Sequence, residues 1–323
     1  MVLRLSSFKA LDSFVLALLA TTLIASLVPC RGFLATVLGR AADAAIVLLF
    51  FLHGARLSRE AIVAGVTHVR LQLTVLLVTF LVFPVLGVLI SRIPVLDPAL
   101  AMGILYLTVL PSTVQSSIAF TSMANGNVPA AVCAATLSNL LGMFLTPALV
   151  AILMKMPRGS ETFSLDSVWS IGLQLLLPFV VGHLVRPWLG AWVQSNKRLV
   201  GGLDRGSILL VVYTALSASV VEGLWSRLSI VSLLTLAAIG GLLLLAVLWL
   251  CWQLGRWLGL KREDRIVLLF CGSKKSLASG VPIAGALFSD AQVGIVLLPI
   301  MFFHQIQLIA CAMLAKRLAV ERR

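Results

Sequence analysis

The stretch "LLFCGSKKSLASGVPIAGALF" (residues 268–288) decides the fold class of this chain. It is apolar over about the 20 residues that a helix needs to cross a bilayer, yet it contains Lys274 and Lys275 among glycines and serines. A charged side chain at the bilayer centre costs at least about 2.5–3.5 kcal/mol. Two lysines at this depth therefore predict either a functional site or a specific partner inside a membrane protein.

Composition supports a membrane environment for the whole chain. Hydrophobic residues make up 60% and charged residues 11%, against about 45–50% and about 25% in soluble domains. The net charge of +13 comes from short basic clusters between apolar runs, so the expected partner is the lipid bilayer and not nucleic acid. The five cysteines lack metal-ligand spacing and are expected to be small core residues. The chain is predicted to be an all-α integral membrane protein.

Ten apolar segments are predicted to cross the membrane, at residues 12–28, 33–55, 71–91, 99–123, 128–154, 167–185, 207–222, 229–254, 264–288 and 291–315. Cytoplasmic loops carry an excess of Lys and Arg. With the N-terminus inside, the only basic residues in loops on the opposite side are Arg31, Arg40, Arg92, Lys155, Arg158 and Arg227. The asymmetry predicts a multi-pass protein of the plasma (inner) membrane with both termini in the cytoplasm.

Internal spacing indicates two repeats, residues 1–161 and 162–323, in one membrane domain. Asp43 and Asp204 each open an apolar run, and their separation equals that of Ser112 and Ser273. Five helices per repeat is an odd number, so the second repeat must run opposite to the first, as in many secondary transporters. We interpret both aspartates as residues near helix starts that favour the positive end of the helix dipole.

Polar clusters occur at matching places in the fourth and ninth segments. The first is "PSTVQSSIAF" from Pro111, and the second is "CGSKKSLASG" from Cys271. Interrupted spans at corresponding positions are the best sequence indication of a transport site, because non-helical backbone at membrane depth must be buried in protein or line a cavity. The alternative is that the serines only bond to their own helix or join neighbouring helices.

Three stretches resemble the bile acid:sodium symporter family, in the branch of the sodium/bile acid cotransporter 7 proteins and their bacterial relatives. They are "LPSTVQSSIAFTSMANGNVPAAV" (110–132), "SNLLGMFLTPALV" (138–150) and "LFCGSKKSLASGVP" (269–282). The resemblance covers nearly the whole chain. It implies ten helices in two inverted repeats, with helices 1, 2, 6 and 7 as a panel and the others as a core. The broken helices 4 and 9 would cross there and, in better-understood members, hold two sodium ions beside the substrate cavity.

The residues that match the family's site are only partly those of a sodium site. Where the sodium-binding members carry Glu and then Gln in helix 9, this chain has Phe270 and Lys274, so no carboxylate remains and no metal site is assigned. The candidate substrate- or ion-binding residues are Gln115, Ser116, Ser117, Thr136, Ser138, Asn139, Ser273, Lys274, Lys275, Ser276, His304 and Gln305, with Gln307 close by.

The lysines suggest that a fixed charge replaces a bound cation. An ammonium close to a sodium site would repel the ion strongly. Lys274 or Lys275 would then either pair with an anionic substrate or take up and release a proton. Adjacent residues on a helix point about 100° apart, so only one lysine is expected to face the cavity unless the helix breaks between them. The alternative is that both side chains snorkel to the membrane surface.

The sequence therefore predicts a secondary active transporter that moves a small organic anion by alternating access. No cofactor is expected, sodium and the proton are alternative coupling ions, and the oligomeric state stays open. Two other classes remain: a regulatory membrane protein that affects ion homeostasis without carrying solute, and a membrane hydrolase. The hydrolase would use Ser273 or Ser276 with one of the lysines as its activating base.

Overall fold

The computed structural model describes residues 13–56, 68–94, 96–154 and 165–320, and all regular secondary structure within these ranges is helical. The first half contains α1 (Ser13–Leu27), α2 (Gly32–Arg56), α4 (Val69–Leu77), the π-helix η3 (Val78–Val82), α5 (Phe83–Ser91), α6 (Pro98–Val109), α7 (Gln115–Met123) and α8 (Val128–Leu153). The second half contains α9 (Leu165–Ser195), α10 (Lys197–Val221), α11 (Leu224–Arg227), α12 (Ile230–Trp257), α13 (Arg262–Gly272), α14 (Leu277–Leu287) and α15 (Asp290–Val320).

Seven helical segments of the described chain are long and apolar enough to cross a membrane. The other predicted segments, 12–28, 99–123 and 167–185, coincide with α1, with α6 and α7, and with α9. All five cysteines are buried and free, as expected from their apolar surroundings. The all-helical membrane class is therefore confirmed.

Two of the predicted segments are each divided into two helices. Segment 99–123 consists of α6 and α7, separated by residues 110–114, which we call the first break. Segment 264–288 consists of α13 and α14, separated by residues 273–276, which we call the second break. Both polar clusters of the sequence fall on these breaks.

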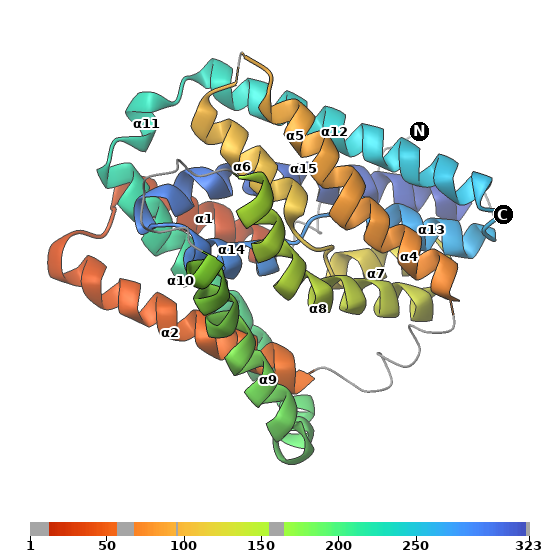
Figure 1. Ribbon diagram of the computed structural model, residues 1–323, viewed down its shortest axis with the longest axis horizontal. Helices are drawn as coiled ribbons and strands as arrows, with labels where there is room; N and C mark the ends of the chain where they lie inside the picture. The colour runs from red at the N-terminus through yellow and green to blue at the C-terminus, as the bar shows by residue number, and fades with distance from the viewer. Residues whose placement is uncertain (1–12, 57–67, 95, 155–164, 321–323) are drawn as a thin grey trace, which may run out of the picture.

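The helices fall into two visible groups (Figure 1). α2 and α9 lie side by side and form one group. They extend away from the second group, which contains α6, α8, α13 and α15. The α2–α9 contact is close because Gly54 packs on the Phe179 carbonyl and Gly182 on the Phe51 carbonyl, where any Cβ would collide with main-chain atoms. α10 contacts both groups, through α2 and through α15, and it also packs against α1 and α14.

The helix-start interpretation of Asp43 and Asp204 is wrong. Asp43 lies near the middle of α2, and Asp204 lies about two turns into α10. The helix dipole acts only within the first turn, so it supports neither residue. Asp204 instead pairs with Arg56, at 2.6 Å between carboxylate and guanidinium, and joins α10 to the end of α2. The error arose because α10 begins at Lys197, before the apolar run of its sequence.

Candidate functional site

The first break follows from a proline. Leu110 is extended, with φ −73° and ψ 154°, as expected for a residue that precedes proline. Pro111 has no N–H and disfavours a helical conformation of the residue before it, and α6, which begins at the Asp97 cap, ends at Val109. The carbonyls at the end of α6, including those of Thr108 and Leu110, are thereby left without their usual helical donors.

Side chains from α8 satisfy the main chain of the first break. The Thr146 hydroxyl donates to the Val109 carbonyl at 2.9 Å, and the Ser112 N–H donates to the Ser138 hydroxyl at 3.0 Å. The Asn139 amide donates to the Ser112 carbonyl at 2.7 Å. Non-helical backbone is thus stable at this depth because neighbouring protein replaces the missing water.

The second break is held by α15 and by the first break itself. The Gln307 side chain accepts from the Lys275 N–H and donates to the Lys275 carbonyl, both at 2.9 Å. The Ser276 N–H donates to the Pro111 carbonyl at 2.9 Å, while the Ser276 hydroxyl caps α14 by accepting from the Ser279 N–H. The Ser279 hydroxyl donates to Asn139 at 2.6 Å, so Asn139 connects the two breaks.

Lys275 occupies a cation site built from main-chain oxygens. Its ammonium nitrogen lies 2.8 Å from the Thr79 carbonyl and 2.7 Å from each of the Thr108 and Leu110 carbonyls. An ammonium has three N–H donors, and all three are used. The nitrogen also lies 4.2 Å from the centre of the Phe83 ring. The side chain is fully buried, so the three carbonyl dipoles and the ring replace its hydration.

The Thr79 carbonyl is free to bind Lys275 because of a second proline, Pro84. In η3 the Phe83 N–H donates to the Val78 carbonyl, one residue beyond the α-helical pattern. The next donor in that pattern would be residue 84, which is Pro84 and has no N–H. The Thr79 carbonyl therefore remains free to accept from Lys275. The sequence signal was Pro84 inside an apolar span, and it was not used in the sequence prediction.

Lys274 has a different environment from its neighbour. Its ammonium donates to the Ser116 hydroxyl at 3.3 Å and lies 4.3 Å and 5.7 Å from the ring centres of Phe120 and Phe270. The side chain is fully buried. Among the described residues no carboxylate pairs with either lysine. The three N–H donors of the Lys274 ammonium thus share one hydroxyl acceptor, whereas each N–H donor of the Lys275 ammonium has its own carbonyl acceptor.

Three bonded hydroxyl groups, from the first break and the start of α7, lie on the Ser116 side of Lys274. The Ser116 hydroxyl donates to Thr113 at 2.9 Å, and Thr113 and Ser117 share a hydrogen bond of 2.9 Å. The Ser117 hydroxyl donates to the Phe270 carbonyl at 3.0 Å and so connects α7 to α13. The structure therefore places Ser116 against Lys274, whereas Ser117 bonds to Thr113 and to the Phe270 carbonyl.

A small cavity lies between α2 and the breaks. Leu49, Phe50 and His53 of α2 form one wall. The opposite wall consists of Pro111, Asn139, Met143, Ser279 and Ile283. Neither lysine lines this cavity. The groups of the site that face α2 are therefore Asn139 and Ser279, and Ser279 was absent from the predicted site residues.

Some predicted site residues lie apart from the breaks' hydrogen-bond network. Gln115 is the first residue of α7 and has an exposed side chain, and Thr136 donates to no group of either break within the described chain. Gln305 leaves its amide nitrogen without a partner among described residues, whereas His304 lies 3.0 Å from Gln307. Ser273 donates back to the Leu269 carbonyl.

The snorkelling alternative is wrong, because both lysine side chains are completely buried.

Replacing Gln307 with leucine should strongly destabilise the protein. The change leaves the buried N–H and carbonyl of Lys275 without partners, at about 1–3 kcal/mol for each group. Thermal unfolding in detergent should show a large fall in Tm. The matched control is Gln305→Leu on the same helix, which removes no hydrogen bond of the second break and should lower Tm much less. Equal losses in the two variants would refute the role of Gln307.

Comparison with known proteins gives one family for nearly the whole chain. Residues 12–320 match the model of the SBF-like CPA transporter family. The Escherichia coli (strain K12) protein named "Putative symporter YfeH" is 51% identical over 96% of this chain and 93% of its own. A Pseudomonas aeruginosa protein, "Uncharacterized protein PA2026", is 52% identical over 96% of this chain and 94% of its own length. Sodium/bile acid cotransporter 7 of Xenopus tropicalis is 24% identical over 82% of this chain and 78% of its own length. The chain belongs to the SBF-like CPA transporter family, a family of membrane transporters and not of enzymes.

Proposed function

We propose that this protein is a secondary active transporter that carries a small organic anion across the plasma (inner) membrane by alternating access. Its ten spans would form two inverted five-helix repeats, residues 1–161 and 162–323, with both termini in the cytoplasm. Support comes from the two breaks, which divide the corresponding spans of the two halves and contact each other through Ser276 and Pro111. Half-helices that meet in this way form the transport site of many secondary transporters.

The observation that carries the proposal is the ammonium of Lys275 among three main-chain carbonyls. Carbonyl oxygens at the ends of broken helices are the ligands that such carriers offer to a coupling cation. Here a covalently attached cation occupies them. In sodium-coupled carriers a bound sodium ion supplies the positive charge at such a site. We infer that the Lys275 ammonium supplies it in this chain, so that transport requires no sodium.

An anionic substrate fits the charge balance of the site. Lys274 adds a second positive charge beside the Ser116 hydroxyl, and no carboxylate of the described residues neutralises it. A buried charge needs a partner, and a substrate carboxylate or similar group would provide one. The cavity between α2 and the breaks is the path by which the substrate would reach this region, after the helices around α2 move relative to the breaks.

The hydrolase alternative does not fit the geometry. A Ser/Lys dyad needs a hydrogen bond between the nucleophile and its base. Ser273 donates to Leu269, Ser276 bonds to Ser279, and the two ammonium groups contact other partners. A regulatory protein that carries no solute remains the competing function, and a transport assay separates the two.

The proposed function is tested with purified protein in sealed vesicles. Thermal-shift screening of organic anions should first identify a stabilising ligand. The labelled ligand should then accumulate inside the vesicles, chemically unchanged, in proportion to an imposed gradient. Vesicles that contain the Lys274→Ala variant serve as the matched control and should accumulate little. Binding without gradient-dependent uptake would favour a regulatory protein, and a chemically altered ligand would favour an enzyme.

A further inference from the structure

Positive charge gathers where α12 ends, α13 begins and α15 ends. These three regions are in contact. The Arg262 guanidinium of α13 donates to the Leu318 carbonyl of α15. The Arg265 stem packs on Gly255 of α12, where an added Cβ would lie 2.7 Å from the arginine Cγ. We call the Lys and Arg residues of this region the basic patch; they are Arg256, Lys261, Arg262, Arg265, Lys316 and Arg317.

The basic patch has few internal partners for its charge. Two carboxylates, Glu263 and Asp264, lie in the first turn of α13. Among the described residues neither forms an ion pair with the patch, and Asp264 accepts from Asn127 at 2.8 Å. The Nη1 group of Arg262 and the Nε group of Arg265 are buried without an acceptor. Buried donors of this kind are rare and costly, so they indicate an acceptor from outside the chain.

Both guanidinium groups are held in place by the protein. That of Arg265 lies 4.1 Å from the centre of the Trp252 ring of α12, and that of Arg262 is fixed by its bond to α15. Both residues remain partly exposed, so an anion can approach them from outside. Stacking on an aromatic ring orients a guanidinium and leaves its N–H edges for other partners. Such edges match the oxygens of a phosphate group.

The face of α12 that leads to the patch is suited to acyl chains. Leu242, Leu245 and Trp249 are exposed and follow at helical spacing, and Arg256 continues the same face two turns later. Trp257, which is 74% exposed, lies next to Arg256. Tryptophan is enriched at the interface between membrane and water. The apolar face therefore lies at the depth of lipid tails, and the patch lies at the depth of headgroups.

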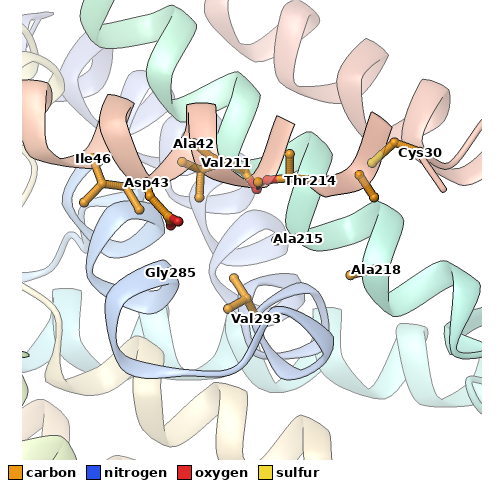
Figure 2. A pocket seen from close by; sticks show the side chains of 12 residues that line it. Cys30, Ala42, Asp43, Ile46, Val211, Thr214, Ala215, Ala218, Gly285 and Val293 are labelled. Carbon is orange, nitrogen blue, oxygen red and sulfur yellow. Dashed lines mark hydrogen bonds between the residues drawn. The ribbon is translucent and has the colours of Figure 1, made fainter. Parts of the chain in front are cut away.

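The patch is separate from both cavities of the described chain. One cavity lies beside the breaks. The other contains Asp43 of α2, which projects toward Gly285 and Val293 (Figure 2). Among the described residues no Lys or Arg lines either cavity. A ligand of the basic patch therefore does not occupy the proposed path of the solute.

We propose that the basic patch binds the headgroup of an anionic phospholipid. The phosphate accepts from Arg262 and Arg265, and the acyl chains lie along the exposed face of α12. This inference goes beyond the proposed function and requires only the membrane environment of the chain. Basic residues on this side also follow from the positive-inside rule. That rule, however, requires neither the stack on Trp252 nor the donors without acceptors.

The test measures lipid binding to the purified full-length protein in detergent and requires no transport. Tm is titrated with phosphatidylglycerol, with phosphatidylcholine of the same acyl chains and with inorganic phosphate, at constant ionic strength. Saturable stabilisation by phosphatidylglycerol is expected, with an apparent affinity at least about tenfold higher than that of phosphatidylcholine. Inorganic phosphate should have no saturable effect. Equal effects of the two lipids, or saturation by phosphate but not by phosphatidylglycerol, would overturn the proposal.

Two patch variants locate the bound lipid. Arg265→Gln should weaken the apparent affinity for phosphatidylglycerol by at least about tenfold. The double variant Lys316→Gln/Arg317→Gln changes only exposed positions, so it should fold normally, and it should weaken binding by about fivefold for each charge removed. The matched control is Arg40→Gln/Arg198→Gln, which removes two exposed charges outside the patch and should leave the affinity unchanged. Equal weakening in the two double variants, or binding that survives in both patch variants, would refute a site at the patch.

Discussion

Replacing Lys275 with alanine is expected to remove most of the folding stability of this protein. The variant leaves the Thr79, Thr108 and Leu110 carbonyls buried without a donor. Each unsatisfied group costs about 1–3 kcal/mol, and typical total stabilities are only about 5–15 kcal/mol. The yield of folded protein and its Tm in detergent should both fall sharply.

A pair of variants separates the charge of Lys275 from its bulk. Alanine vacates the volume of a propylammonium group, so n-propylammonium added in solution should raise the Tm of Lys275→Ala. Methionine fills much of that volume with a side chain that cannot donate, so Lys275→Met should be destabilised and should not be rescued at this position. Variants as stable as the wild type would show that the three carbonyls need no cation.

Replacing Lys274 with alanine is expected to abolish anion uptake while leaving most of the protein folded. Only one hydroxyl contact and two ring contacts of the ammonium are lost, and no carboxylate of the described residues is left unpaired. If Lys274 pairs with the substrate, the loss of a buried charge pair should reduce uptake by at least about 30-fold. Initial uptake rates in vesicles, normalised to folded protein, measure the effect.

Lys274→Arg distinguishes the two roles that the sequence leaves open for this residue. Arginine keeps the charge but does not release its proton in proteins. Full retention of uptake would favour charge pairing, whereas retained ligand binding with lost dependence on a proton gradient would favour proton transfer. Ser116→Ala is the comparison variant, because it keeps both lysines and removes the hydroxyl that accepts from Lys274 and donates to Thr113. Wild-type uptake by Lys274→Ala would contradict both roles.

The apolar spans and the first break could be predicted from the sequence because each has a local cause. Long apolar runs specify helices in a membrane, and Pro111 ends α6 one residue after an extended Leu110. The position of Gln115 was harder to predict. Its polarity suggested the site, but the first break ends at residue 114, so Gln115 begins α7 with an exposed side chain.

The different environments of the two lysines could not be read from their adjacency. On a continuous helix one would face the site and the other would not, but the second break lets both be buried among different partners. The ligands of Lys275 are main-chain carbonyls, which carry no sequence signature of their own. Pro84, which frees the Thr79 carbonyl, and Pro111, which follows the Thr108 and Leu110 carbonyls, give only an indirect signal. Gln307 could be placed on a polar face of the tenth span, but its two bonds to Lys275 depend on the tertiary fold.

Uptake with sodium removed tests the central claim that Lys275 supplies the cation of the site. Vesicles containing wild-type protein are loaded and diluted into buffers in which sodium is replaced by N-methylglucamine, with the identified anion as substrate and with the proton gradient and voltage held constant. An undiminished initial rate is expected, because a fixed ammonium already bonds to the three carbonyls. A steep and saturable sodium requirement would contradict it.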